Sequence, residues 1–255
     1  MRRSFLFGFL AGLALLITAG VGASRLKQRD KEEQAYRQEL VDATPVQLNV
    51  LTDKQRVHGR LYSHYAQVRA GRSISGLVGD AKGQVRIVET MVFIGSSPEL
   101  IQPETPESFF GRLAQNSDAI IRGRVTKKTS QITEDDSFVF TDYDVVTNEV
   151  LKNNVAAPIE TGTTITITRP AGKVVLDGVI VKATDAAFAP LSLNNEVVLF
   201  LKYLPETGTY QTSQATGSFE LDGSSLRPLT KEAFPPGVLR GSDSFLQTVR
   251  TISKE

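Results

Sequence analysis

Residues 163–181 read TTITITRPAGKVVLDGVIV, and this stretch decides the fold of the second half of the chain. In its first six residues apolar and polar side chains alternate, which is typical of a strand with Ile165 and Ile167 facing a core. Two short apolar runs then flank Asp177-Gly178, a dipeptide that favours a tight type I′ turn because both central residues need positive φ. The stretch therefore predicts a strand followed by a β-hairpin.

Strand patterns recur on both sides of this stretch. Five further segments show them: residues 119–128, 138–151, 196–203, 209–212 and 218–221. The apolar phase shifts within residues 138–151, which predicts a bulge or a sharp bend, and residues 196–203 are apolar enough for a strand buried on both faces. Strands that follow one another without intervening helices predict a mainly β domain, an antiparallel barrel or sandwich, over residues 116–232.

Four short segments resemble a recurrent module of exported bacterial proteins. They are SDAIIRGRV (117–125), VLK (150–152), ITITRPAG (165–172) and NEVVLFL (195–201). The module's own segments are D-x-I-V-x-G-x-V, V-L-K-G, P-G-G and G-E-x-x-L-x-F-L, and this chain has Asn153, Ala171 and Asn195 where the module has Gly. The resemblance covers roughly residues 117–230 and implies an oligonucleotide/oligosaccharide-binding-like (OB-like) barrel. It carries almost no functional content.

The beginning of the chain carries a localisation signal. Arg2 and Arg3 precede residues 4–24, which contain no charge and are long enough to cross a bilayer core as a helix. We expect residues 1–24 to be a signal peptide or a retained membrane anchor, and basic residues on both sides blur the orientation. The arginine pair also resembles the core of a twin-arginine export signal. A buried N-terminal helix of a cytoplasmic protein is the remaining alternative.

The segments between the leader and the strands are more mixed. Residues 25–44 are densely charged and predict a solvated helical stalk or a frayed linker. Residues 45–115 predict a mixed α/β segment with a strand at 85–94 and a helix that begins at Pro106. Helical spacing is also seen at Val57, Leu61, His64 and Val68.

After a Pro-Pro-Gly break, the chain ends in a predicted helix within residues 233–255. We expect Ser242 or Ser244 to cap it and the helix to continue through Ile252. The fold class that follows is mainly β, α+β overall. It combines a leader helix, a small mixed segment, an OB-like barrel or sandwich and a C-terminal helix.

Composition excludes several classes of function. A net charge of +1 argues against nucleic acid as a partner, and the absence of cysteine removes thiolate metal sites and cysteine nucleophiles. The two histidines, His58 and His64, are six residues apart, which places them about 240° apart around a helix. They are therefore not expected to share a metal. The acidic run at 134–136 lacks calcium-loop spacing and is interpreted as a turn. We expect no metal and no cofactor.

Four residues are predicted to bind a ligand. Arg169 ends a strand beside Gly172, where the ligand loops of a barrel gather, and this arrangement suggests an anion site. A plain barrel corner is the alternative interpretation. Asn194 and Asn195, in the loop before the buried strand, complete the set.

Catalytic signatures are missing from the sequence. Ser213 and Ser218 lack a nucleophile elbow, and no phosphate-binding glycine loop is present. The leading interpretation is a non-catalytic envelope domain that binds an envelope protein or a surface polymer through the barrel loops. Residues 4–24 would hold it in the membrane, facing the periplasm or exterior, or would be cleaved to release it. The alternatives are a protease-inhibitor-like barrel and a hydrolase with unrecognised catalytic residues.

Overall fold

The computed structural model describes residues 30–47, 50–63, 73–79, 83–90, 105–231, 234–235, 237–238 and 241–253. The predicted leader at residues 1–24 lies outside them, as do His64, Val68 and the last part of the strand expected at 85–94. Strands make up 40% of the structure and helices 24%, which confirms a mainly β chain. Within the described residues, no helix has both the length and the apolar character that a membrane span needs.

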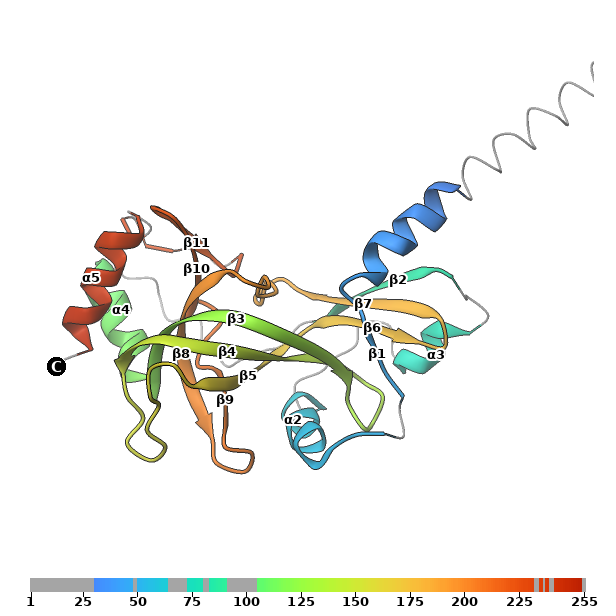
Figure 1. The fold of residues 1–255 in the computed structure, drawn as a ribbon, viewed down its shortest axis with the longest axis horizontal. Coiled ribbons are helices and arrows are strands. Elements are labelled where there is room, and N and C mark those ends of the chain that lie inside the picture. Colours follow the sequence, from blue (N-terminus) through green and yellow to red (C-terminus); the bar gives the residue numbers. More distant parts are fainter. Residues whose placement is uncertain are drawn as a thin grey trace, which may run out of the picture.

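The described elements follow the order shown in Figure 1. Besides a helix over residues 30–40, the helices are α2 (Asp53–Ser63), α3 (Ile74–Val78), α4 (Pro106–Gln115) and α5 (Ser242–Ile252). The strands are β1 (Thr44–Pro45), β2 (Val85–Thr90), β3 (Ala119–Ile132), β4 (Val139–Lys152), β5 (Thr164–Pro170), β6 (Gly172–Leu176), β7 (Val179–Asp185), β8 (Glu196–Leu204), β9 (Thr209–Thr212), β10 (Ser218–Asp222) and β11 (Ser225–Pro228).

Seven of these strands form a sheet in the order β11-β10-β8-β3-β4-β5-β9, and β8 also pairs with β9. The strands β8, β3, β4, β5 and β9 are thereby joined in a cycle, so that the sheet is partly ringed (Figure 1). The pairings within the cycle are antiparallel except that of β5 with β9, which is parallel. Three register shifts interrupt the long β3–β4 pairing, which confirms the irregularity predicted within residues 138–151.

A second sheet of four strands stands beside the ring, in the order β1-β6-β7-β2. The predicted turn between β6 and β7 is confirmed, with φ of 50° at Asp177 and 78° at Gly178. The hairpin does not join the ringed sheet, which corrects the expectation of a single antiparallel barrel. Its strands also pair with β1 and β2, in parallel. Sequence periodicity does not reveal these partners because they come from a distant part of the chain.

The chain leaves the ring for the second sheet at Ala171 and Gly172, whose φ values are 69° and 152°. A Cβ on Gly172 would lie 2.2 Å from Thr141 Oγ1 and 2.7 Å from Ser130 Oγ. The position therefore needs glycine both for its backbone conformation and for its space. Those two hydroxyls hydrogen-bond to each other, and Thr141 also donates to the Ala171 carbonyl.

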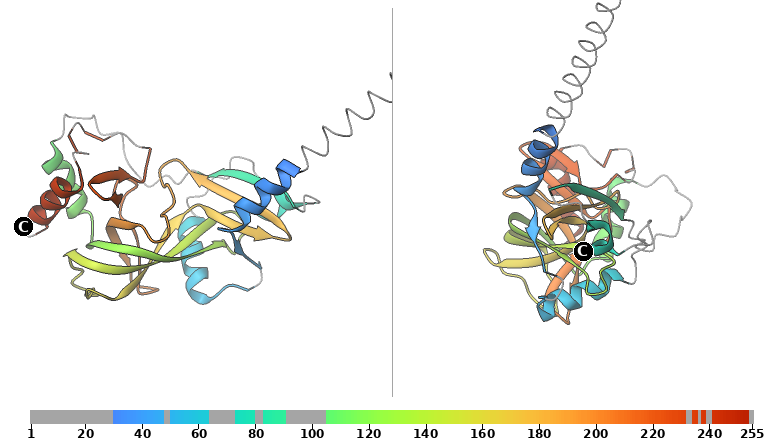
Figure 2. Two further views of the ribbon diagram at one scale, coloured as in Figure 1. Left: turned by 45° about the horizontal axis from the view of Figure 1, so that its top comes forward. Right: turned by 90° about the vertical axis from the view of Figure 1, so that its right-hand side faces the viewer.

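Four apolar clusters fill the molecule. One lies on the inner face of the ring and one lies between the ring and the helices α4 and α5, where Phe110, Phe200, Phe219 and Phe245 meet. A third joins the ends of β3 and β4 to the second sheet and α3, and the fourth lies under α2. Figure 2 shows α4 and α5 at one end of the molecule and the second sheet at the other.

The contacts of α5 and of the helix over residues 30–40 differ from those that the sequence predicted. α5 begins after Gly241 without a side-chain cap, because Ser242 instead donates its hydroxyl to the Gly223 carbonyl (3.0 Å), so the predicted serine cap is wrong. The helix over residues 30–40, expected to be a free stalk or linker, docks on the β6–β7 hairpin. Its Glu39 pairs with Lys173 and with Lys182 (2.8 Å).

Candidate functional site

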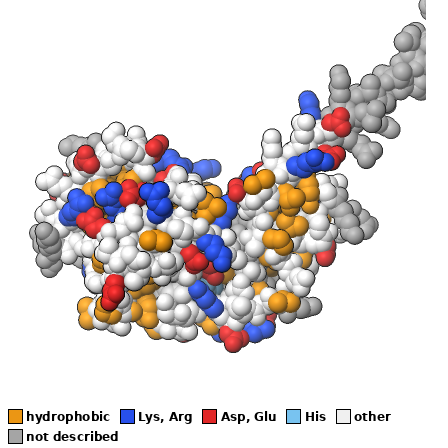
Figure 3. Space-filling view, viewed as in Figure 1, with side chains coloured by type: hydrophobic (Ala, Val, Ile, Leu, Met, Phe, Trp, Pro, Cys, Tyr) orange, Lys and Arg blue, Asp and Glu red, His pale blue; other side chains and the backbone are white. Residues whose placement is uncertain are grey.

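A polar groove opens where the chain enters β8 and turns between β10 and β11. Its volume is about 280 Å³, and it is lined by Arg124, Asn194, Asn195, Glu196, Leu221, Asp222 and Gly223. Both asparagines that the sequence singled out therefore line the groove. Figure 3 shows basic and acidic side chains intermingled on the half of the molecule that contains the ring.

The loop that carries the two asparagines is fixed to β3. Asn194 has a left-handed backbone (φ 66°), a conformation that asparagine tolerates better than most residues. Its N–H donates to the Val125 carbonyl (2.8 Å), and its carbonyl accepts from Arg124 Nη1 (2.9 Å). The side-chain amide of Asn195 donates to Glu220, which also pairs with Arg227. The groove is thus preformed rather than built from a loose loop.

A ladder of charges holds one side of the groove. Arg122 donates to both carboxylate oxygens of Glu196 at 2.9 Å, and Asn148 donates to the same carboxylate at 3.2 Å. These hydrogen bonds, that of Arg122 above all, lower the pKa of Glu196. Arg250 of α5 continues the ladder with a bidentate pair to Glu149 (2.8 and 2.9 Å). The carboxylate of Glu196 is therefore ionised and fixed at neutral pH.

The other predicted pair, Arg169 and Gly172, lies elsewhere. Arg169 pairs with Thr141 in the β4–β5 register, whereas Arg124 of the groove pairs with Val146, five residues along β4 and about 17 Å away. Arg169 is not in a surface loop: it is 1% exposed, and burial lowers its pKa. Gly172 forms the crossing between the two sheets. The four predicted residues thus fall into two separate places.

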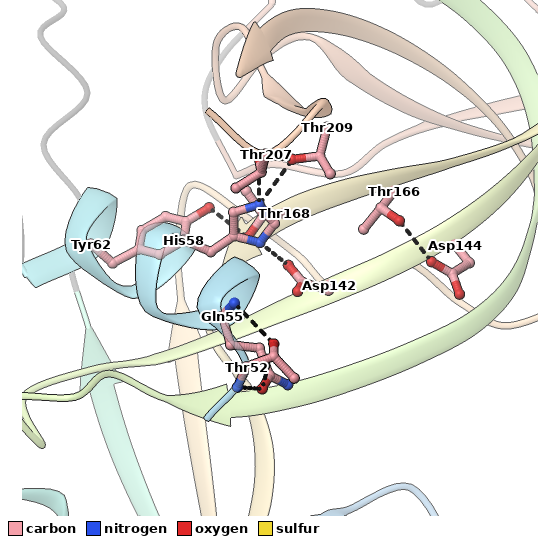
Figure 4. Close-up of polar contacts among 10 residues, drawn as sticks. All are labelled: Thr52, Gln55, His58, Tyr62, Asp142, Asp144, Thr166, Thr168, Thr207 and Thr209. Atoms are coloured by element: carbon pink, nitrogen blue, oxygen red, sulfur yellow. Dashed lines mark hydrogen bonds and ion pairs between the residues drawn. The ribbon is translucent and has the colours of Figure 1, made fainter. Parts of the chain in front are cut away.

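A buried polar cluster that the sequence patterns did not predict lies under α2 (Figure 4). His58 has no exposed surface; its Nδ1 lies 2.8 Å from Asp142 Oδ1, and its Nε2 lies 2.9 Å from Thr209 Oγ1 and 3.1 Å from Thr207 Oγ1. One turn later, Tyr62 stacks on Phe138 and Phe140. The i, i+4 spacing of two large rings, His58 and Tyr62, was the available signal for this buried face.

The order carboxylate, imidazole, hydroxyl matches the arrangement used in nucleophilic hydrolysis. Here the imidazole is enclosed by α2, β4 and the β8–β9 turn, so a substrate has no path to it in this conformation. What the cluster does visibly is join three elements far apart in sequence through hydrogen bonds that satisfy both ring nitrogens. We interpret it as the set of hydrogen bonds that holds α2 on the outer face of β4 and β5.

The acidic run at 134–136 also has a structural role. Asp136, with φ 57°, accepts hydrogen bonds from the Ser75 N–H (3.1 Å) and from the Ser75 hydroxyl, which ties α3 to the β3–β4 turn. In the part of the chain that the structure describes, no three histidine or carboxylate side chains gather as a metal site would require. No model of a known protein family matches the chain, and no curated protein matches it in sequence.

Proposed function

We propose that the protein is a non-catalytic, envelope-attached binding module, and that the groove around Asn194 and Asn195 contacts a surface polymer or an envelope protein. The observation that carries this proposal is the groove itself. Its rim offers a guanidinium on Arg124, carboxylates on Glu196 and Asp222, and the amides of the asparagines. Such a mixture of donors and acceptors suits a partner rich in hydroxyl or amide groups.

We further propose that the partly ringed sheet is an OB-like barrel. Five strands are joined in a cycle, and β5 and β9, the third and fifth of them in chain order, pair in parallel. Both features support this assignment. Barrels of this kind commonly bind ligands on the face of their second and third strands and on adjoining loops. In this chain that face, on β4 and β5, is covered by α2. The groove supplies an open surface in its place.

The size of the groove limits what enters it. Pockets that enclose a drug-sized ligand span about 300–1,000 Å³, and 280 Å³ lies just below that range. The groove therefore accommodates one unit or one side chain of a larger partner. The net charge of +1 gives no general attraction for nucleic acid, so we do not propose nucleic acid as that partner.

Attachment to the envelope is proposed from the uncharged residues 4–24 if they are retained as an anchor; their cleavage on export would release the protein. The helix over residues 30–40 docks beside the second sheet, through Glu39 and through Tyr36, whose hydroxyl donates to the Gly178 carbonyl (3.0 Å). In Figure 1 this helix and the α4–α5 end lie at opposite ends of the molecule. An anchor on this helix would therefore leave the ringed sheet pointing away from the membrane.

The test compares three forms of the full-length protein for co-sedimentation with purified insoluble envelope polymer and with envelope membranes. We expect wild type to be retained and the double variant Arg124→Gln, Asn195→Ala to lose most of that retention. Lys127→Gln is the matched control, because it removes a positive charge from an exposed position on the same strand. Equal retention of all three forms, or none by wild type, would contradict the proposal.

A hydrolase is the second candidate, and the Asp142–His58–Thr209 arrangement is the observation that favours it. It would require α2 to move so that His58 becomes accessible. Turnover of an ester or peptide substrate that is lost in His58→Gln but retained in the groove variant would support the hydrolase over the binding module.

A further inference from the structure

Arg169 is the largest fully buried side chain of the described residues, and none of its guanidinium nitrogens has a hydrogen-bond partner among them. A guanidinium carries five N–H donors and remains charged under ordinary conditions. Its Cζ lies 5.5 Å from the centre of the Phe188 ring. That cation–π contact leaves the N–H donors without hydrogen-bond acceptors. A buried charge of this kind needs a partner.

The ionisable groups around Arg169 act on its charge electrostatically, but none of them accepts a hydrogen bond from its guanidinium. Tyr62, Tyr143 and Asp185 are the groups that act on it electrostatically. Burial raises the pKa of both tyrosines, so they are neutral at physiological pH. The Asp185 carboxylate accepts from the Ala187 N–H at 2.8 Å and makes no hydrogen bond to the guanidinium. The donor edge of Arg169 is therefore open to a further acceptor.

Two hydroxyls at the same end of the ring are also buried and unsatisfied: Thr212 Oγ1 and Ser218 Oγ. In the parallel β5–β9 pairing Ile167 faces Tyr210, both in the inner apolar cluster, and two residues further along each strand come Arg169 and Thr212. Because strand side chains alternate, both point to the inner face. Ser218 pairs with Leu199, another inner-face residue, and so shares that face.

The loop between the two hydroxyls closes this end of the ring. Its residue Ala215 packs in one cluster with Phe188, the ring that lies under the guanidinium. Arg169, Thr212 and Ser218 thus share the inner face at one end of the ring, where the apolar interior gives way to polar groups that have no hydrogen-bond partner among the described residues. A guanidinium with free donors and hydroxyls on the same face is the arrangement that oxyanion sites use.

We propose that the guanidinium of Arg169, with the hydroxyls of Thr212 and Ser218, binds a small oxyanion inside the ring. The guanidinium fork matches two oxygens of a phosphate, sulfate or carboxylate, and the hydroxyls donate to the remaining ones. Buried water would satisfy the N–H groups, but it would leave Asp185 as the only carboxylate that acts on the charge, and Asp185 makes no hydrogen bond to it. The proposal goes beyond the groove and does not depend on it.

The test measures the unfolding temperature of the full-length protein at neutral pH and constant ionic strength, with chloride replaced stepwise by phosphate or by acetate. We expect a rise of about 5–10 °C at a hundredfold excess of the preferred anion over its dissociation constant, and above that constant the rise should grow with the logarithm of the anion concentration. Phosphate also stabilises proteins in general by exclusion, so the decisive quantity is the difference between wild type and Arg169→Met. That variant should lose the part of the rise that comes from specific binding.

Two further variants keep the test decisive if Arg169→Met does not fold. Thr212→Val and Ser218→Ala each remove one hydroxyl at nearly constant volume and should weaken the affinity for the anion about tenfold or more. Arg124→Gln is the control, because it alters the groove and should keep the full response. No rise in wild type with either anion, or a rise unchanged in the Arg169 and hydroxyl variants, would overturn the proposal.

Discussion

His58 and Arg169 lie on opposite faces of the same pair of strands, and both are almost completely buried. His58 packs on the outer face of β4 and β5, and each of its ring nitrogens has a hydrogen-bond partner. Arg169 extends from the inner face of β5, and its guanidinium has no partner among the described residues. A satisfied buried polar group stabilises the fold, whereas an unsatisfied one calls for an explanation such as a bound water or ion.

The contrast also separates the two proposed roles. The open groove at Asn195 is polar and preformed, and its fixed charges are neutralised by neighbours such as Arg122. The enclosed place at Arg169 carries a charge without hydrogen-bond partners among the described residues. We proposed that the groove contacts a large partner and that the enclosed place binds a small anion. Substitutions that act on each side of the contrast distinguish these roles.

The largest effect is expected from His58→Ala. The substitution leaves the Asp142 carboxylate, 12% exposed, without its imidazole partner and creates a cavity under α2. We expect the free energy of unfolding to fall by about 3–5 kcal/mol in urea titrations. Arg60→Ala, on the exposed side of the same helix, should cost less than about 0.5 kcal/mol. Similar losses in both variants would mean that the hydrogen bonds of His58 do not hold α2 in place.

A smaller loss is expected where the chain crosses between the sheets. Gly172→Ala would place a methyl group against Thr141 Oγ1 and Ser130 Oγ, so we expect a loss of about 2–3 kcal/mol. Gly178→Ala is the matched comparison: its φ is also positive, but the space around it is open, and it should cost about 1 kcal/mol. Urea titration of both variants measures the difference. Equal losses would show that crowding at the crossing is relieved at no cost.

Arg169→Met is expected to behave in the opposite way to His58→Ala. In a chloride buffer without oxyanions it removes a buried charge that has no hydrogen bonds, while it loses a cation–π contact with Phe188 and the electrostatic attraction of Asp185. We expect the free energy of unfolding to be unchanged or to rise by about 1 kcal/mol. A loss of more than about 2 kcal/mol under these conditions would show that the guanidinium already has its partners within the chain.

Much of the fold was predictable because its signals are local. Alternation in β5 and the Asp177-Gly178 turn depend on neighbouring residues, and both were confirmed. The partners of β6 and β7 were not predictable, since β1 and β2 come from a segment separated from them by the whole β3–β4 hairpin. Periodicity specifies that a segment is a strand, but it does not specify which sheet the strand joins.

The two buried polar residues show how much of the site was predictable. The helical spacing of Val57 and Leu61 predicted a buried face one residue away from the observed one, which contains His58. The burial of His58 was not predictable because the residues that contact it come about 80 to 150 residues later in the chain. Arg169 was expected at a surface corner. The alternation that turns Ile165 and Ile167 inward continues to Arg169, so the sequence predicts that the Arg169 side chain also points inward. The sequence does not predict that the guanidinium lacks hydrogen-bond partners, because this depends on the packing of residues from other strands.

The smallest effect is expected at Glu39, a half-buried carboxylate that pairs with two lysines. Hydrogen bonds from Lys173 and Lys182 lower the pKa of Glu39 below its ordinary value of 4.5. A depressed carboxyl pKa contributes stability that is present above that value and is lost as the pH falls through the folded-state pKa. Glu39→Gln should therefore cost about 0.5–1 kcal/mol at pH 7 and progressively less below pH 4.5. Urea titrations across this pH range measure the difference. A cost for Glu39→Gln that persists unchanged at low pH would show that Glu39 contributes through packing or neutral hydrogen bonds rather than through its charge.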